Sequence, residues 1–212
     1  MKRLVFFTLI LGTAITLFAQ TPIPQHRFAS GRWQFSGSTL SQDDADARLA
    51  KINFRVPQSG PMIYEFSVKY EDGAEDGHGG FGLHIFVDSP YDGESWGAGK
   101  SYLLWLNYDE APYTPGIPRG LSAQVYRSLT NSRMELVESI SLDEYLPVLL
   151  ENLDKPIPFK IEANGDTGEV RVYDPANPNA YFYFFIDRRD LPMKGDWVSL
   201  RTNGIKLSFT MD

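Results

Sequence analysis

The 212 residues contain no cysteine, which excludes disulfide bonds and thiolate metal sites. Acidic side chains outnumber basic ones by 27 to 20, and the resulting net charge of −7 argues against nucleic acid and anionic membrane surfaces as partners. The chain is rich in aromatic residues and long enough to bury most of its surface as one domain.

The first 19 residues have the pattern of a secretion signal peptide. Lys2 and Arg3 supply a positive start, residues 4–18 form an apolar run, and Ala19 is a small residue before the cut. The alternative, a retained anchor, is disfavoured because the run is too short to span a bilayer comfortably. We expect cleavage after Ala19 or Gln20. The mature protein would be periplasmic or extracellular, without a transmembrane segment, and not a lipoprotein, because no Cys follows the signal.

The next part of the chain indicates short strands separated by turns. Residues 20–31 form a polar, proline-containing lead-in, and 32–35 are a strand candidate. An acidic loop at 41–46 precedes an alternating strand at 48–56. Residues 57–61 begin and end with proline, which indicates a turn.

The stretch 62–109 contains three apolar, aromatic-rich runs joined by two polar loops. The runs at 62–70 and 81–88 alternate with a period of two, which indicates β-strands. The run at 101–108 is apolar on both faces, which is typical of a strand that is central or covered by another layer. We expect the three strands to be neighbours in the middle of one sheet.

The second half of the chain contains a hairpin and the single helix candidate. Residues 121–129 and 134–140 indicate a hairpin. Residues 141–153 carry a leucine stripe, with Ser141 as a plausible N-cap, although Pro147 limits where the helix can begin.

The remaining segments predict strands at 159–163, 169–173, 181–186, 197–201 and 205–211. Asn164-Gly165 and Asn203-Gly204 are dipeptides typical of tight hairpins. About twelve short strands and one short helix near 143–153 predict an all-β sandwich or barrel, with a single domain over 32–212.

Several short motifs occur in order along this domain. They include WQFSG at 33–37, YEFSV at 64–68, GFGLHI at 80–85 and GDWVSLRT at 195–202. Their order and spacing resemble the concanavalin A-like lectin/glucanase (laminin G-like) jelly rolls. The resemblance implies two curved antiparallel sheets, with ligands usually on the concave sheet and its rim loops. The superfamily includes carbohydrate-binding modules, glycoside hydrolases and structural domains, so the fold does not settle the function.

A hydrolase would need two carboxylates that face each other across the scissile bond. Enzymes of this superfamily place them on one strand as Glu-x-Asp-x-x-Glu, and this motif does not occur in the chain. Glu65 instead shares its face with Ser67 and Lys69. We therefore assign no catalytic residue, and a hydrolase-like enzyme is the least favoured of the functions considered.

The acidic loop at 71–78 could bind Ca²⁺, because hard carboxylate oxygens are dense there. The candidate ligands are Asp72, Glu75 and Asp76. A solvated turn without metal is the favoured alternative, and no other cofactor is expected. The three histidines are scattered, which disfavours zinc.

Sugars dock on aromatic faces flanked by polar side chains. If the strands of 62–109 are neighbours, alternation gathers such residues on one face, with later residues extending it and a loop tryptophan at the rim. The candidate ligand-binding residues are Glu65, His84, Trp105, Asn107, Gln124, Tyr126 and Trp96. Alternation also places Phe86 on this face, and the alternative is that Trp105 and Phe86 belong to the core and His84 is a satisfied buried histidine. We expect an exported, non-catalytic binding module whose ligand is a glycan or an envelope protein.

A structural subunit of an envelope or surface assembly, such as a filament sheath, is the main alternative. The Tyr-rich segment 181–185 would then contact protein. A large exposed apolar patch away from the concave face would favour this alternative.

Overall fold

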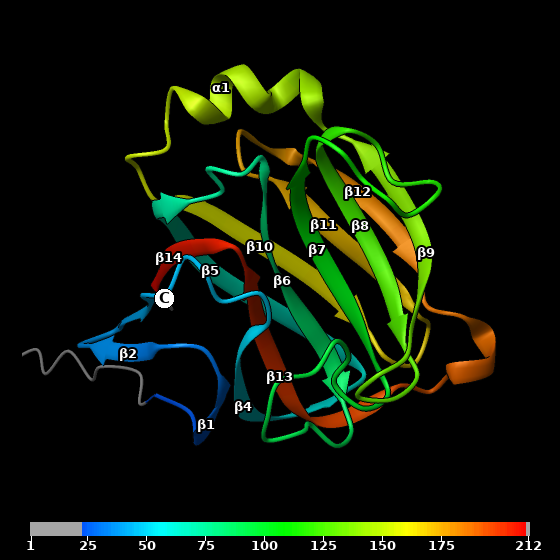
Figure 1. Ribbon diagram of the computed structural model, residues 1–212. Coiled ribbons are helices and arrows are strands. Elements are labelled where there is room, and N and C mark those ends of the chain that lie inside the picture. The colour runs from blue at the N-terminus through cyan, green and yellow to red at the C-terminus, as the bar shows by residue number, and fades with distance from the viewer. Residues whose placement is uncertain (1–22, 211–212) are drawn as a thin grey trace, which may run out of the picture.

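The computed structural model describes residues 23–210, so the proposed signal peptide at 1–19 lies outside the described part of the chain. Within that part, two seven-stranded antiparallel sheets pack face to face as a sandwich (Figure 1). The prediction of an all-β, two-sheet fold with one short helix is confirmed, with fourteen strands in place of about twelve. No helix among residues 23–210 is long and apolar enough to cross a membrane.

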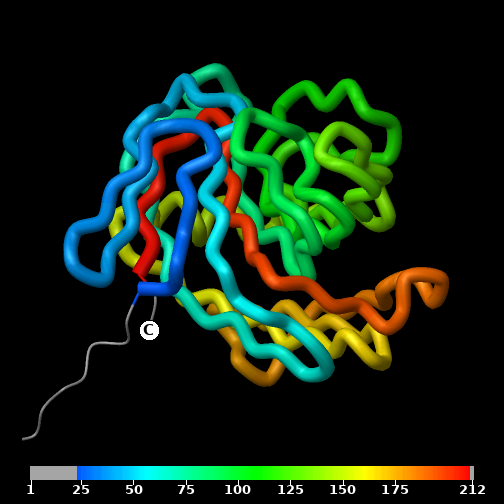
Figure 2. Tube along the Cα trace, turned by 90° about the horizontal axis from the view of Figure 1, so that it is seen from below, coloured from blue at the N-terminus to red at the C-terminus, as the bar shows by residue number. Residues whose placement is uncertain are grey.

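We call the two layers sheet A and sheet B, and Figure 2 shows them from below. The strands of sheet A, in spatial order, are β1 (His26–Ser30), β4 (Ala50–Ser59), β13 (Lys194–Asn203), β6 (His78–Val87), β7 (Ser101–Asp109), β8 (Gly120–Ser128) and β9 (Met134–Ser141). Those of sheet B are β12 (Asn177–Phe185), β11 (Glu169–Asp174), β10 (Ile157–Asn164), β5 (Pro61–Gly73), β14 (Ile205–Thr210), β3 (Thr39–Gln42) and β2 (Trp33–Ser36).

The expectation that the three strands of 62–109 are neighbours is wrong. β6 and β7 are adjacent in sheet A, but β5 lies in sheet B. The chain changes sheets in the short connection after β5, where Gly73, Ala74 and Gly77 have positive φ angles of 105°, 59° and 73°. Asn203-Gly204 likewise connects β13 in sheet A to β14 in sheet B and forms no hairpin. Alternation reveals that a segment is a strand, but it does not reveal the sheet to which the strand belongs.

Other boundaries differ in smaller ways. β1 falls inside the expected lead-in and pairs with β4. The hairpin of β8 and β9 is confirmed. A 3-10 turn, η1 (Asp143–Tyr145), precedes α1 (Leu146–Leu150), which has a proline in its first turn. Ser141 ends β9, and its Oγ accepts a hydrogen bond from the Asp143 amide at 3.3 Å, although Leu142 occupies the N-cap position of η1. In Figure 1, α1 lies over one end of the sandwich.

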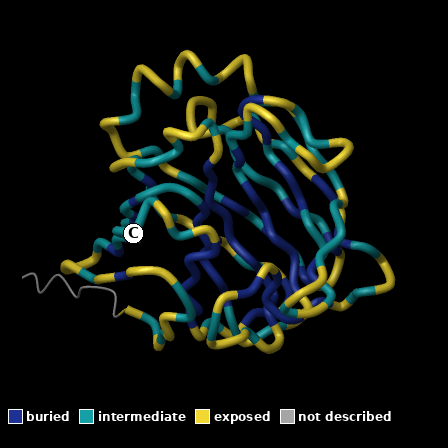
Figure 3. Tube along the Cα trace, in the orientation of Figure 1, coloured by how far each residue is buried: buried dark blue, intermediate teal, exposed yellow. Residues whose placement is uncertain are grey.

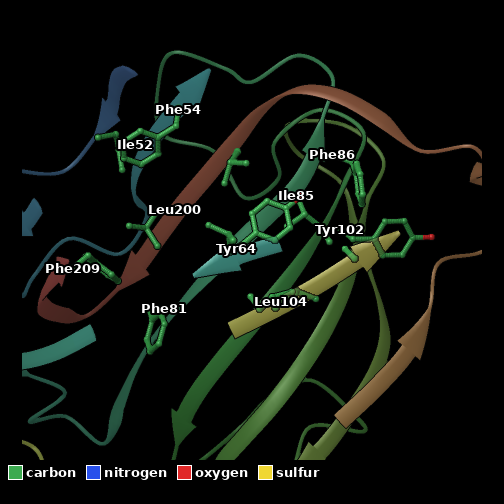
Figure 4. Close-up of a cluster of buried hydrophobic side chains, with 14 of the residues drawn as sticks. Ile52, Phe54, Tyr64, Phe81, Ile85, Phe86, Tyr102, Leu104, Leu200 and Phe209 are labelled. Atoms are coloured by element: carbon green, nitrogen blue, oxygen red, sulfur yellow. The ribbon is translucent and has the colours of Figure 1, made fainter. Parts of the chain in front are cut away.

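The core fills the space between the sheets (Figure 4). Phe81 of sheet A packs against two rings of sheet B, with centroid distances of 5.3 Å to Phe159 and 6.0 Å to Phe209. Burial also extends beyond this layer. β6 and β7 are buried along most of their length (Figure 3), so their outer faces are covered as well. The expectation that 101–108 is central or covered by another layer is confirmed.

Candidate functional site

The outer face of sheet A, which points away from sheet B, is the most polar buried surface of the sandwich. Alternate residues of its strands, such as Ile52, Leu83, Leu104 and Leu200, belong to the core cluster. The residues between them point to the opposite side because side chains alternate along a strand. Many of these outward residues are polar and yet buried.

Strand register arranges these residues in rows across the sheet. The middle row contains Lys51, Arg201, Gly82, Trp105, Gln124 and Ser139. A second row contains Asn53, Ser199, His84, Leu103, Tyr126 and Leu136. A third contains Asn203, Gly80, Asn107, Ser122 and Ser141.

The structure brings five of the seven candidate ligand-binding residues together in these rows. They are His84, Trp105, Asn107, Gln124 and Tyr126. Trp96, from the loop at 88–100, also reaches this face, as described below. Glu65 does not, because β5 lies in sheet B; its carboxylate is 3.9 Å from Lys160 Nζ, on a different surface.

Phe86 departs from simple alternation along β6. Counting by two places it beside His84, but it belongs to the core cluster between the sheets. Its φ angle is +55°, which is unusual for a bulky residue, and β13 has a register shift opposite this part of β6. The Phe86 amide donates to Gln58 Oε1 at 2.8 Å, which fixes the reversed segment.

Trp105 lies flat on the outer face because two glycines leave room for its ring. A Cβ at Gly82 would be 2.8 Å from Trp105 Cε3, and one at Gly80 would be 2.9 Å from Cζ2. The indole Nε1 donates to Asn107 Oδ1 at 3.0 Å. Trp105 is therefore buried, but it belongs to the outer face and not to the core between the sheets.

The polar side chains beside Trp105 form a hydrogen-bonded chain. The Tyr126 hydroxyl donates to Gln124 Oε1 at 2.7 Å, and Gln124 Nε2 donates to Ser122 Oγ at 2.9 Å. His84 Nδ1 lies 3.0 Å from Ser101 Oγ, while His84 Nε2 is buried and has no hydrogen-bond partner among residues 23–210. His84 is therefore buried, as the alternative expectation stated, but only one of its two ring nitrogens is hydrogen-bonded.

Lys51 attaches the loop at 88–100 to this face. Its Nζ is fully buried and donates to Ser95 O at 2.8 Å, Ser95 Oγ at 2.8 Å and Gly97 O at 2.6 Å. In the second row, Asn53 Nδ2 donates to Tyr91 O at 3.4 Å. These contacts hold the loop against the sheet at Lys51 and Asn53.

Arg201 lies between two tryptophans. Its guanidinium carbon is 4.9 Å from the ring centroid of Trp105 and 5.2 Å from that of Trp96. Nη1 donates to Trp96 O at 2.8 Å, and Nε is buried without a partner in the described part of the chain. Only 4% of Arg201 is exposed, whereas Trp96 is 58% exposed. The outer side of this stack is therefore an accessible aromatic surface.

The electrostatics of the face are cationic. Burial, followed by repulsion from Arg201, lowers the pKa of Lys51 to about 7. Burial also lowers the pKa of Arg201 to about 10. The pKa of His84 is lowered by burial and then by the two neighbouring cations, which keeps its imidazole neutral. Among residues 23–210, no Asp or Glu forms a salt bridge with Lys51 or Arg201.

Sequence reasoning missed Lys51 and Arg201. Both lie at polar positions of predicted strands, where the sequence alone indicates ordinary charged side chains that face the solvent. In each strand, the charged residue stands beside an apolar neighbour, which is a weak sign of burial. This sign points to Lys51 and Arg201 as site residues only when β4, β13 and β6 are known to be adjacent.

No protein-family model matches the sequence, and no curated protein matches it. Solved structures match over most of the chain. The carbohydrate binding module CBM66 from Bacillus subtilis superposes with a TM-score of 0.59 at 13% identity, over 89% of this chain and 94% of that one.

The CBM2 module of the evolved Dit of Lactobacillus casei BL23 phage J-1 gives a TM-score of 0.54 at 12% identity, over 88% and 80% of the two chains. A protein with a galectin-like fold from Bacillus subtilis gives 0.50 at 14% identity, over 88% and 86%. The chain has the concanavalin A-like sandwich fold. Identities this low show the fold alone.

In this concanavalin A-like sandwich, the acidic segment 71–78 covers the end of β5 and the connection to β6, and it does not assemble the candidate calcium ligands. Asp72 Oδ2 accepts a hydrogen bond from Lys206 Nζ at 2.7 Å, and Asp76 Oδ1 accepts one from the His78 amide at 3.1 Å. Within the part of the chain that the structure describes, no three His, Asp or Glu side chains come close enough to hold a metal ion. Asp72, Glu75 and Asp76 are therefore not brought together as a ligand set.

A second surface of the concanavalin A-like sandwich lies on sheet B. Tyr181, Tyr183 and Phe185 alternate along the edge strand β12 and are each about half exposed. The ring planes are strongly inclined, by 66° between the two tyrosines and by 85° between Tyr183 and Phe185. The rings therefore form an apolar ridge and not a flat stacking platform.

Proposed function

We propose that this protein is an exported, non-catalytic glycan-binding module. The observation that carries the proposal is the outer face of sheet A. There an exposed tryptophan, Trp96, lies above a floor that contains Trp105, two amide side chains and Tyr126. Structural neighbours that are carbohydrate-binding modules support this function, although their identities are too low to transfer a ligand.

The chemistry of this face suits a sugar. The C–H face of a pyranose or furanose ring stacks on an indole such as the exposed Trp96, and its hydroxyls need donors and acceptors held in fixed positions. Gln124, Asn107 and Tyr126 offer such groups. Asn107 is held by the Trp105 indole, and Gln124 is held by Tyr126 and Ser122. Binding by a preformed site avoids part of the entropy cost of ordering side chains.

A glycan array tests the proposal with purified wild-type protein, Trp96→Ala, Trp105→Ala and Tyr183→Ala. Tyr183 is a matched control because it is an aromatic residue of similar exposure on the other sheet. We expect wild type and Tyr183→Ala to bind the same glycans and both tryptophan variants to lose them. Absence of any bound glycan, or binding that survives both tryptophan substitutions, contradicts the proposal.

One observation favours the structural alternative, a subunit of an envelope or surface assembly. The ridge of Tyr181, Tyr183 and Phe185 lies on an edge strand, and unpaired edges bearing exposed apolar side chains are suited to protein contacts. Sedimentation of wild type and Tyr183→Ala over a range of concentrations tests it. Self-association that is lost in the variant, together with no glycan binding, favours the assembly subunit.

Export is part of the proposal and has its own test. Cell fractionation followed by N-terminal sequencing should find the mature chain outside the cytoplasm, beginning near Gln20 or Thr21. A cytoplasmic chain that retains Met1 contradicts it.

A further inference from the structure

The outer face of sheet A holds two neighbouring cations without an anion. Lys51 and Arg201 are direct partners in the pairing of β4 with β13, so their side chains leave the sheet side by side. Both are buried, and no carboxylate among residues 23–210 forms a salt bridge with either one. Buried charges are normally paired, so this arrangement requires an explanation.

The two cations differ in how far they are satisfied. Lys51 Nζ has three oxygen acceptors, which match the three donors of an ammonium group. Arg201 makes a single hydrogen bond among the described residues, from Nη1 to Trp96 O, and its Nε is buried without a partner. The unused part of the guanidinium is therefore the edge formed by Nε and Nη2.

We propose that the glycan bound on this face is acidic and that a sugar carboxylate occupies the Nε–Nη2 edge of Arg201. This inference rests on the glycan-binding function proposed above. A carboxylate pairs with two parallel N–H groups of a guanidinium, and this geometry matches the buried, unpartnered edge of Arg201 among the described residues. The guanidinium carbon lies within about 5 Å of the ring centroids of both Trp96 and Trp105, so the two rings restrict its position before the ligand arrives.

Electrostatics support an anionic ligand over a neutral one. Burial and repulsion from Arg201 lower the pKa of Lys51 to about 7. A negative charge beside Arg201 would offset this repulsion and stabilise the charged forms of both side chains. His84, in the next row, and Tyr126, on β8, face the same site, and neither supplies a negative charge near neutral pH. A neutral sugar would leave the two cations uncompensated.

The test compares glycans that differ in charge. The array carries neutral, uronic-acid-containing and sulfated glycans, and each bound uronate is then measured in solution beside its carboxyl methyl ester. We expect the bound set to consist of carboxylate-bearing glycans and methyl esterification to weaken binding about tenfold or more, because two charge-assisted hydrogen bonds are lost. The ester keeps the stereochemistry of the sugar and removes its negative charge.

Variants locate the effect. Arg201→Gln should weaken the uronate about tenfold or more, whereas Arg201→Lys should retain part of the affinity because it keeps the charge without the paired donors. Arg171→Gln is the matched control, since Arg171 also lies over an aromatic ring, 5.1 Å from that of Tyr181, but on sheet B. Circular dichroism checks that each variant is folded, and the ester comparison with wild type keeps the test decisive if Arg201→Gln does not fold.

The outcomes separate this inference from the proposed function. Binding of neutral glycans, lost in Trp96→Ala, supports the glycan-binding function but overturns the acidic ligand. A preference for sulfated glycans over uronates also overturns the carboxylate assignment, as does equal affinity for a uronate and its methyl ester. If no glycan of any class binds, both proposals fail.

Discussion

The stability of this protein should rise with pH between 7 and 9.5 because of Lys51. Its pKa is lowered from 10.5 to about 7 in the folded protein, first by burial and then by Arg201. In this pH window the unfolded chain still binds the lysine proton that the folded chain has released. Raising the pH weakens the stabilisation that this bound proton gives to the unfolded state, so folding is favoured.

The size of the effect follows from the two pKa values. Linkage between a pKa of about 10.5 and one of about 7 gives a rise of about 3 kcal/mol in the free energy of unfolding from pH 7 to pH 9.5. The pKa of His84 is lowered by burial and by the same cations, so its contribution lies near and below its ordinary pKa of 6.5, outside most of this window. Lys51 therefore dominates the slope.

Urea unfolding followed by tryptophan fluorescence at several pH values measures this slope. Lys51→Met should flatten it and also lower the stability at pH 9.5, because the oxygens of Ser95 and Gly97 lose their donor. Lys194→Met, an exposed lysine of β13, should keep the wild-type slope. A flat wild-type profile, or a Lys51→Met profile as steep as that of wild type, would refute the reasoning.

Three further substitutions test the packing and the site. Gly82→Ala should displace the ring of Trp105, which a Cβ would meet at 2.8 Å, and a tryptophan emission spectrum identical to that of wild type would contradict this. Phe209→Ala should cost about 3–5 kcal/mol of unfolding free energy in urea, since Phe209 is 1% exposed, and a loss below about 1 kcal/mol would contradict its core role. Asp190→Asn should cost about 1–3 kcal/mol in the same assay by breaking the bidentate pair with Arg127, and an unchanged midpoint would show that the pair contributes nothing.

Local alternation predicted the strands well, because a strand buried on one face shows alternating apolar and polar residues within a short stretch of sequence. The strands β5, β6, β7, β8 and β9 were all anticipated near their observed bounds. Sheet membership was not, because a connection of four residues after β5 is enough to send the chain to the other layer. Glu65 was consequently assigned to a face that it does not share.

The sequence could predict those site residues that lie on strands consecutive in the chain. β6, β7 and β8 follow one another in the chain and in sheet A, so alternation alone placed His84, Trp105 and Gln124 on one face. Lys51 and Arg201 come from opposite ends of the domain and meet this face only through the pairing of β4 with β13 and of β13 with β6. Only the topology of the sheet brings them into the site.

The two buried cations contribute differently to the site. Replacing buried charges by well-packed apolar residues is often neutral or stabilising, so stability alone does not explain why Lys51 and Arg201 lie under a covering loop. Lys51 has all its donors bonded to the loop at 88–100 and therefore holds the cover in place.

Arg201 contacts the loop through one donor and keeps a free edge, so it is the residue arranged to meet a ligand. This division of roles predicts opposite outcomes in two variants. Lys51→Met should loosen the loop and increase the amide hydrogen exchange of residues 95–97, whereas Arg201→Lys should leave that exchange near the wild-type rate while weakening uronate binding. Loss of protection in both variants to the same extent would show that the two cations act together as loop anchors, and that Arg201 has no separate role in binding.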